Sequence, residues 1–262
     1  MPNNIKPAIN IAIWHIAPES VTQPQCIATL KTWLSSDETA RMVRLHQPQH
    51  QHAFLISHAL KRGALARILN VHPATLIFGV GSHGRPFLMR QPDQIDLQFN
   101  LSHTKGMAAI AVSQNAYIGL DVESLNRKGP DTEFAARMFT PPEYQDILEQ
   151  APERQRHRLL EYWTLKEAYI KAEGLGISIG LDTFNFRICS SEPSFHLHAN
   201  AREPSHAWRF KQLNPTTSHL MALAWAPLKP YDLETVKNIG LKQTVNNRLA
   251  YFDLNVADWL NF

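Results

Sequence analysis

The feature that most constrains the fold of this chain is a short pattern that occurs once in each half of the sequence. In each half, a Ser-His pair precedes an alanine-rich apolar run, and a Leu-Lys pair lies upstream in a segment with helical spacing. The matching residues are Ser102-His103 and Ser218-His219, residues 107–111 and 221–224, and Leu60-Lys61 and Leu165-Lys166. Repetition of several elements in the same order indicates a duplicated structural unit.

A duplicated unit predicts an α+β fold in which two similar halves form a pseudo-dimer. Small-molecule sites favour such interfaces, so we expect a site in the cleft between the halves. We place the N-terminal half at residues 1–114, the C-terminal half at 115–228, and an extension that packs on the body at 229–262. The alternative is that short helices and alanine-rich strands resemble one another by chance, and the sequence alone leaves it open.

Hydrophobic periodicity supplies the elements of each half. Alternating isoleucines near the start predict a strand, and a helix with Leu30 and Trp33 on its apolar face follows. Ser35 with Glu38 three residues later is typical of a helix start. The remaining expected elements are a helix over residues 50–69, strands over 75–80, 97–101, 107–113 and 117–123, and a helix with a final apolar segment over 231–262.

Composition restricts the function more than it defines it. The chain has 262 residues, of which 44% are hydrophobic and 19% charged, as in ordinary globular proteins. Its 26 basic and 23 acidic residues give a formal charge of +3, which is too small to indicate nucleic acid but suits anionic small molecules or acidic proteins. No apolar run approaches the roughly 20 residues that span a bilayer, so we expect a cytoplasmic protein.

Two carboxylates are placed on one face of a predicted strand. In Gly119-Leu120-Asp121-Val122-Glu123 the acids are two residues apart, so both side chains point to the same side of the strand. Mg²⁺ prefers such anionic oxygen ligands, with water and phosphate in its remaining positions. Taken alone, the pair is also compatible with a solvated strand face.

A third acid lies on a predicted helix in the C-terminal half. Helical spacing aligns Trp163, Glu167 and Lys171 on one stripe. An exposed Glu-Lys pair that only stabilises the helix is the simpler alternative. Gly174 and Gly176 indicate a helix end where the backbone adopts positive φ and can approach a ligand.

A third segment combines groups that suit phosphate oxygens. The strand expected near residue 101 ends in Ser102, His103 and Lys105 before Gly106, which offers hydroxyl, imidazole and amine at one turn. Upstream, Arg85 stands in a Gly-Arg-Pro turn. A lone Ser-His pair is more often structural than catalytic, and no partnered acid indicates a serine hydrolase triad.

Together these motifs resemble the signature of the Sfp-type 4′-phosphopantetheinyl transferases. That signature consists of a Gly-Lys/Arg-Pro turn, a Phe-Asn-x-Ser-His strand end, a Gly-x-Asp-x-Glu strand and a Trp-x-x-Lys-Glu-x-x-x-Lys helix. The matching segments are Gly84-Arg85-Pro86 and residues 99–103, 119–123 and 163–171, in the same order. The family is similar to a fused tandem of half-sized units, which gives the repeat a meaning and places the active site between the halves.

The resemblance implies roles for individual residues. Asp121, Glu123 and Glu167 are expected to hold Mg²⁺, Glu167 or a water that it orients to take the serine proton, and Lys171 to contact the pyrophosphate. The residues expected to hold the nucleotide phosphates of coenzyme A are Arg85, Ser102, His103 and Lys166, with Arg41 and His58. This chain departs from the family pattern at His58, where many relatives carry arginine, and at Glu38, where some carry lysine.

The implied reaction transfers the 4′-phosphopantetheine of coenzyme A to a serine of an apo acyl or peptidyl carrier protein and releases 3′,5′-ADP. We expect a monomer whose partners are coenzyme A and a carrier with an acidic helix around the acceptor serine, in fatty acid, polyketide or nonribosomal peptide synthesis. Apolar residues between the acidic strand and the Trp helix are expected to dock the carrier, although a core role fits several of them. These are Met138, Phe139, Tyr144, Ile147 and Leu148.

Two other classes of function are compatible with parts of this pattern. A magnesium-dependent phosphohydrolase or nucleotidyl transferase needs the acids, but it gives no role to the Trp-Lys-Glu helix. A non-catalytic module that binds carrier domains requires the acids to be dispensable, yet Asp121, Glu123 and Glu167 are all present.

Overall fold

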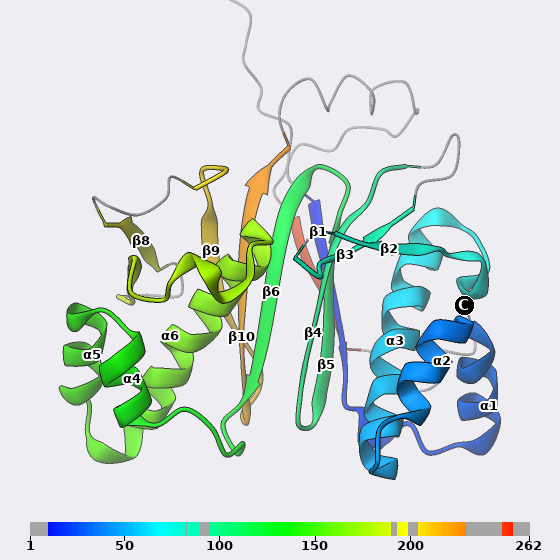
Figure 1. Cartoon of the computed structure of the whole chain (residues 1–262), viewed down its shortest axis with the longest axis horizontal. Coiled ribbons are helices and arrows are strands. Elements are labelled where there is room, and N and C mark those ends of the chain that lie inside the picture. Colours follow the sequence, from blue (N-terminus) through cyan, green and yellow to red (C-terminus); the bar gives the residue numbers. More distant parts are fainter. Residues whose placement is uncertain are drawn as a thin grey trace, which may run out of the picture.

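The chain folds into two similar α+β halves that lie side by side (Figure 1). This computed structural model describes residues 10–81, 83–89, 95–189, 193–198 and 204–228, and the backbone of 248–253. The helices are α1 (Pro24–Trp33), α2 (Ser36–Val43), α3 (Pro48–Leu69), α4 (Thr132–Met138), α5 (Pro141–Leu148) and α6 (Pro152–Glu173), with 3₁₀ turns η1 (Pro18–Ser20), η2 (Pro73–Thr75) and η3 (Gly176–Ile179). Most of the strands occupy the middle of the molecule, with α1–α3 on one side and α4–α6 on the other.

The described strands form two larger sheets and two small hairpins. They are β1 (Asn10–Ile16), β2 (Phe78–Val80), β3 (Pro86–Leu88), β4 (Gln98–Thr104), β5 (Met107–Ser113), β6 (Ala116–Ser124), β7 (Phe184–Arg187), β8 (Ser194–Leu197), β9 (Arg209–Thr216), β10 (His219–Pro227) and β11 (Arg248–Asp253). The sheet orders are β11-β1-β5-β4 and β6-β10-β9, and the hairpins are β2-β3 and β7-β8. Apart from β11, every pairing is antiparallel.

These orders confirm the repeat predicted from the sequence. The antiparallel trio β1-β5-β4 corresponds to β6-β10-β9, and in each half a 22-residue helix, a 3₁₀ turn and a small hairpin come before the last two strands of the trio. The strand register agrees as well. Ile16 of β1 pairs with Ala108 of the alanine-rich strand β5, and Asp121 of β6 pairs with Ala222 of the matching strand β10. The expected strand over 75–80 is shorter than predicted, since η2 takes its first residue and β2 only its end.

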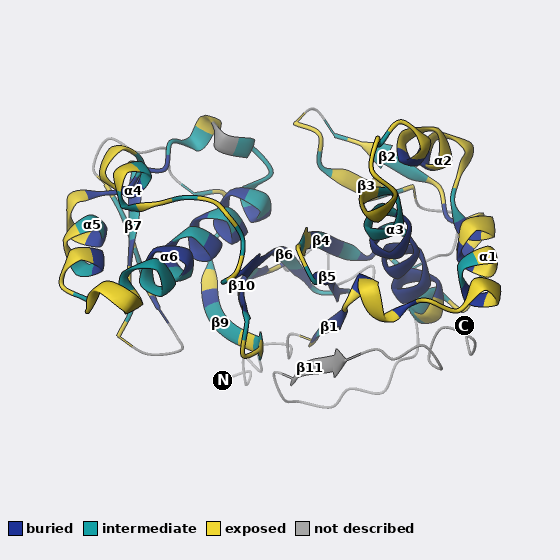
Figure 2. Cartoon of the chain, turned by 90° about the horizontal axis from the view of Figure 1, so that it is seen from below, coloured by how far each residue is buried: buried dark blue, intermediate teal, exposed yellow. Residues whose placement is uncertain are grey.

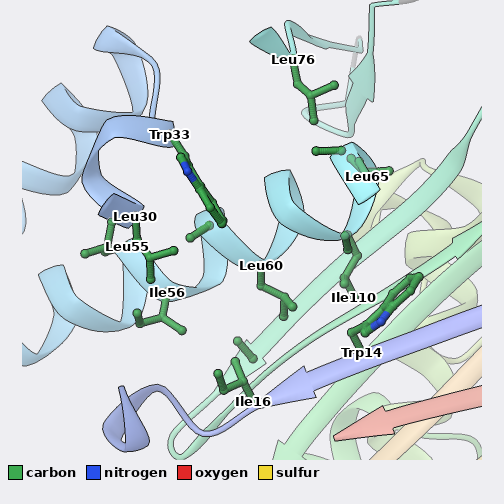
Figure 3. Close-up of a cluster of buried hydrophobic side chains, with 14 of the residues drawn as sticks. Trp14, Ile16, Leu30, Trp33, Leu55, Ile56, Leu60, Leu65, Leu76 and Ile110 are labelled. Carbon is green, nitrogen blue, oxygen red and sulfur yellow. The ribbon is translucent and has the colours of Figure 1, made fainter. Parts of the chain in front are cut away.

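The described core residues form three hydrophobic clusters, one within each half and one that joins the halves. Alternation along β5 sends Ile110 and Val112 toward α3, while Ala109 and Ala111 face the strands of the other half. Figure 3 shows Leu60 and Leu65 of α3 beside residues of β1 and β5. A second cluster lies between α6 and its sheet, and a third joins the inner faces of β1, β5, β6 and β10. Seen from below, the buried residues concentrate on these strands and on the helix faces turned to them (Figure 2).

A buried ion pair occurs at the same place in both halves. In the first half, Lys61 Nζ lies 2.7 Å from a Glu38 oxygen, and Arg62 Nε lies 2.7 Å from the other oxygen. In the second half, Lys166 Nζ lies 2.8 Å from Glu143, and both side chains are fully buried. Glu143 and Lys166 each follow Glu38 and Lys61 by 105 residues. The pair therefore belongs to the repeated scaffold.

The C-terminal segment differs in part from its predicted form. Residues 248–253, expected within a helix and apolar tail, form β11 and pair in parallel with β1. The rest of the extension, including Trp259, Leu260 and Phe262, lies outside the described residues. Among the helices described here, none is long and apolar enough to cross a membrane.

We predict that Lys166→Met lowers the free energy of unfolding by about 3–5 kcal/mol, because it leaves the Glu143 carboxylate buried without its cation. Urea titration followed by circular dichroism measures this loss. The double variant Glu143→Gln with Lys166→Met removes both charges and should recover part of the stability. A loss below about 1 kcal/mol in Lys166→Met would show that the pair is not a structural requirement.

Candidate active site

The candidate site lies where the two halves meet, along the neighbouring strands β4 and β6. Both are edge strands of separate sheets, so backbone groups on their facing edges need other partners. Asn100 Oδ1 accepts the N–H of Leu120 at 3.0 Å, and Ser102 Oγ accepts the N–H of Val122 at 3.2 Å. Side chains two residues apart on β4 thus bridge to alternate N–H groups of β6.

We call this line of contact between β4 and β6 the seam. It holds the first acid in place. Asp121 is almost fully buried, and its Oδ1 accepts hydrogen bonds from Lys171 Nζ at 2.6 Å and Ser102 Oγ at 3.0 Å. Its Oδ2 is also buried but has no hydrogen-bond partner among the described residues. Buried carboxylate oxygens are rarely left without a donor, so Oδ2 is a candidate ligand for a cation.

The second acid is held by three side chains. Glu123 Oε1 accepts a hydrogen bond from Trp163 Nε1 at 2.9 Å and forms an ion pair with Arg127. Its Oε2 accepts a hydrogen bond from Thr104 Oγ1 at 3.3 Å. Asp121 and Glu123 are only 5% exposed, so their shared face is a buried site and not the solvated strand face that the sequence also allowed.

Helix α6 supplies the third acid and the lysine. The predicted stripe is confirmed, since Trp163 contacts Glu123 and Lys171 contacts Asp121, with Glu167 between them on the helix. Gly119 makes this close packing possible, because a Cβ at that position would lie 2.1 Å from the carbonyl oxygen of Ala168. Any larger residue in β6 at that point would push α6 away from the acids.

The three acids influence one another electrostatically. Burial raises the pKa of Glu167, and the negative charges of Asp121 and Glu123 raise it further, while Lys171 opposes them. Burial likewise raises the pKa of Asp121, although Lys171 lowers it in part. Asp121 and Glu167 therefore resist ionisation more than the same carboxyl groups do in water.

The donor set fits a hard divalent cation. Three carboxylates share one region, burial and then mutual repulsion raise the pKa of Asp121 and of Glu167, and Oδ2 of Asp121 has no donor within the described ranges. In the described part of the chain, no three such groups are already gathered at metal-binding geometry. Instead, Lys171 and Arg127 supply positive charge to Asp121 and Glu123.

Two residues assigned to the nucleotide phosphates have other roles. Lys166 was predicted to bind a phosphate, but all three of its donors are used inside the second half, by Glu143 and the carbonyls of Leu181 and Phe184. Ser102 is 4% exposed, and its hydroxyl is occupied within the seam. Lys166 has no donor left for a phosphate, so that prediction is wrong, whereas the phosphate contact of Ser102 stays a prediction. The sequence pattern alone does not reveal which polar side chains are buried.

The other predicted phosphate ligands lie in two places. Arg85 donates to the carbonyls of Ala172 at 2.8 Å and Ile118 at 3.0 Å, so it fastens the β2-β3 hairpin to α6. His103 is exposed at the end of β4, where partial desolvation and the Lys171 charge lower its pKa. Arg41 and His58 both contact the Phe54 ring in the first half.

Several residues of the site were not found from the sequence. Asn100 and Thr104 flank Ser102 with the spacing of one strand face, a signal that was available but does not reveal which strand it meets. Arg127 lies in the turn after β6, and nothing in the local pattern indicates its ion pair with Glu123. The role of Gly119 depends on how closely α6 approaches, which only the fold determines.

Comparison with known proteins agrees with this geometry. A model of the 4′-phosphopantetheinyl transferase superfamily matches residues 117–224, and one of the N-terminal part of 4′-phosphopantetheinyl transferases matches residues 22–115. The 4′-phosphopantetheinyl transferase HetI of Nostoc sp. is 33% identical over 229 residues, which cover 86% of this chain and 91% of that protein. The chain belongs to the 4′-phosphopantetheinyl transferase superfamily.

Other members of the superfamily match with lower identity or over shorter spans. The phosphopantetheinyl transferase of Thraustochytrium sp. is 30% identical over 219 residues, covering 79% of this chain and 74% of that protein. The 4′-phosphopantetheinyl transferase Sfp of Bacillus subtilis is 29% identical over 157 residues, covering 60% of this chain and 67% of Sfp. The resemblance stated from four short motifs is thereby confirmed at the level of the superfamily.

We predict that Glu167→Gln stabilises the protein in the absence of divalent cations. Because the folded-state pKa of Glu167 is raised, stability is lost as the pH rises from the unfolded-state pKa through the folded-state pKa. Removing the charge should raise Tm by roughly 2 °C at pH 7.5. Below about pH 4, where the carboxyl is protonated in both states, the difference should vanish.

Scanning fluorimetry in buffers with EDTA between pH 3.5 and 8.5 measures this dependence. Glu161→Gln on the same helix is the matched control, because Glu161 forms an ion pair with Arg158 and should lose stability or stay unchanged. A destabilising effect of Glu167→Gln at pH 7.5 would contradict the electrostatic picture of the cluster.

Proposed function

We propose that this protein transfers the 4′-phosphopantetheine moiety of coenzyme A to a serine of an apo carrier protein. The observation that supports this most strongly is the assembly of Asp121, Glu123 and Glu167 with Lys171 at the seam between the halves. The chain aligns with 91% of a relative named a 4′-phosphopantetheinyl transferase, so the proposed activity concerns the whole enzyme and not a shared module alone.

The proposed reaction is a phosphoryl-type transfer. The serine oxygen of the carrier attacks the β-phosphorus of coenzyme A, a new P–O bond forms, and the bond from that phosphorus to the bridging oxygen breaks. The departing group is 3′,5′-ADP, and the serine proton goes to a base. Such reactions need positioning and neutralisation of charge more than covalent chemistry.

We propose that Asp121, Glu123 and Glu167 hold Mg²⁺, whose role would be to neutralise the pyrophosphate and stabilise the leaving phosphate. Glu167 is proposed to accept the serine proton, directly or through an oriented water, and its raised pKa favours that task. The ammonium of Lys171 is 30% exposed and donates to Asp121 and Ser102, which leaves its third N–H for the pyrophosphate.

The nucleotide side of coenzyme A is proposed to lie along the first half. His103 is exposed beside Lys171 and remains the best candidate for a phosphate contact from β4. His58 stacks on Phe54 with the two ring centroids 3.9 Å apart, and its Nδ1 contacts Glu38, so only Nε2 is left for a ligand. Arg41 is exposed, lies against the ring of Phe54 and is proposed to offer its guanidinium to a phosphate.

The carrier is proposed to approach from α4 and α5. Of the five apolar residues expected to dock it, Phe139 and Ile147 are core residues at 5% and 0% exposure, so a docking role for these two is wrong. Leu148 is 41% exposed, while Met138 and Tyr144 are partly buried, and these three carry the docking proposal. We further propose Sfp-type breadth toward carriers and a monomer, since one chain supplies both sides of the seam.

We predict that Glu167→Gln lowers the rate of transfer by about 100-fold or more, because it removes the proposed base and a cation ligand. The measurement follows labelled coenzyme A on a panel of apo carriers from fatty acid, polyketide and nonribosomal peptide systems. Glu161→Gln is the control and should keep full activity.

Three results would count against the proposal in different ways. Undiminished transfer by Glu167→Gln would remove the role of that residue. A folded wild-type protein that modifies no carrier would remove the function and favour a carrier-binding module. Release of 3′,5′-ADP without a carrier would favour a phosphohydrolase.

A further inference from the structure

The two Ser-His pairs that match in the sequence occupy different places in the fold. Ser102-His103 lies in β4, before the turn at residues 105–106 that leads into β5. In the second half, His219 follows the equivalent turn between β9 and β10 and is the first residue of β10. The side chain of His219 is 8% exposed. A role assigned to His103 therefore does not transfer to His219, whose contacts must be considered separately.

The His219 ring contacts the β4–β5 turn of the other half. Its Nε2 lies 2.9 Å from the carbonyl oxygen of Lys105. Lys105 and Gly106 form the turn, since Thr104 and Met107 on either side of them are paired. The ring also lies directly against Gly106, because a Cβ at that position would come within 3.3 Å of two ring atoms. A residue of the second half thus holds a turn of the first.

The neighbours of the ring determine which nitrogen carries the proton. A carbonyl oxygen only accepts, so Nε2–H of His219 donates to it. Thr216 Oγ1 lies 2.8 Å from Nδ1 and itself accepts the N–H of Ser218 at 3.2 Å, which leaves the hydroxyl proton of Thr216 for Nδ1. In the neutral imidazole, this contact favours the tautomer that binds the turn.

The same turn is attached to the second half at the preceding residue. Thr104 Oγ1 donates to Glu123 Oε2 of β6 at 3.3 Å, and Ser124, the residue after Glu123, pairs with His219 of β10. Two successive residues of the turn region therefore contact two neighbouring strands. A distance of 3.3 Å is long for a hydrogen bond between oxygens, so this bond depends on how firmly the turn is held.

From these contacts we propose that His219 is a positioning residue, which holds the β4–β5 turn so that Thr104 supports the carboxylate of Glu123. Its effect on the acid is transmitted through Lys105 and Thr104. Supporting hydrogen bonds of this kind commonly tune how well a carboxylate binds a metal. The proposal rests on the proposed function, because there Glu123 acts as a ligand of Mg²⁺.

Three variants and a matched control test the proposal. His219→Leu removes the donor to Lys105 at similar size, whereas His219→Gln keeps an N–H donor that can reach the same carbonyl. Thr104→Val removes the hydroxyl and keeps the shape of the side chain. The control is Ser113→Ala, because Ser113 is 3% exposed, lies at the opposite end of β5 and donates to the carbonyl of Asn10.

His219→Leu should lower kcat for transfer by about 3–10-fold, because Glu123 loses its support. KM for coenzyme A should stay within about threefold of the wild type, since His103 lies within the β4–β5 ladder opposite Ala108 and keeps its place. In scanning fluorimetry without coenzyme A, the Mg²⁺ concentration that gives half of the maximal rise in Tm should increase about threefold. His219→Gln should recover most of both losses, and Ser113→Ala should change neither quantity.

The route through Thr104 is tested by combining His219→Leu with Thr104→Val. If His219 acts through Thr104, the double variant should have about the same kcat as Thr104→Val alone. Effects of independent residues would multiply. A double variant whose loss in kcat equals the product of the two single losses would therefore contradict the proposed route.

Two further results would overturn the proposal. One is an unchanged kcat and Mg²⁺ midpoint in His219→Leu, and the other is a loss in that variant that His219→Gln does not recover. Failure of the wild-type protein to modify any carrier would contradict the proposed function instead. In that case the Mg²⁺ titrations of the same variants would still decide whether His219 supports Glu123.

Discussion

The rest of the structure depends on the close approach of α6 to β6 at Gly119. A side chain there would collide with the backbone of Ala168 and Ala172, so only glycine lets the helix lie against the strand. That approach brings Glu167 and Lys171 of the helix within reach of the acids on β6. The same strand meets β4 of the other half through side-chain hydrogen bonds, and one short stretch of β6 therefore fixes the helix, the seam and the acids together.

The duplication explains both the scaffold and its departure from symmetry. Glu38 and Lys61 recur as Glu143 and Lys166, and both pairs anchor a long helix to the segment before it. At the same offset of 105 residues, Arg62 and Ala66 of α3 correspond to Glu167 and Lys171 of α6. The corresponding first strands of the two halves also differ in what lies along their outer edges. The edge of β1 pairs with the backbone of β11, whereas the edge of β6 contacts side chains of β4. Only one of two similar halves has therefore acquired the acid and the lysine.

The sequence predicted the parts of this arrangement that depend on local periodicity. Strand alternation placed Asp121 and Glu123 on one face, helical spacing aligned Trp163 with Glu167 and Lys171, and both patterns persist because they follow from backbone geometry. Less could be predicted about which side chains meet in the folded chain. Lys166 and Ser102 lie in motifs beside residues that the sequence predicts to bind ligands, yet each contacts partners distant in the sequence, including Glu143 and Val122. Likewise, β11 pairs with β1 across almost the whole chain, a contact that no local pattern indicates.

Two kinds of buried charge coexist in the second half, and their hydrogen bonding distinguishes them. Glu143 receives bonds from Lys166, Thr140 and the N–H of Phe186, so the desolvation of its charge is compensated on both oxygens. Asp121 has one oxygen with no donor among the residues that the structure describes, and Glu167 is shifted toward its neutral form by burial and by the other acids. A scaffold gains nothing from such under-compensation, since it costs folding free energy at neutral pH. In the proposed function, an incoming cation and a phosphorylated substrate would complete the charge balance of the acids. The fully hydrogen-bonded pair therefore belongs to the scaffold, and the under-compensated acids mark the candidate site.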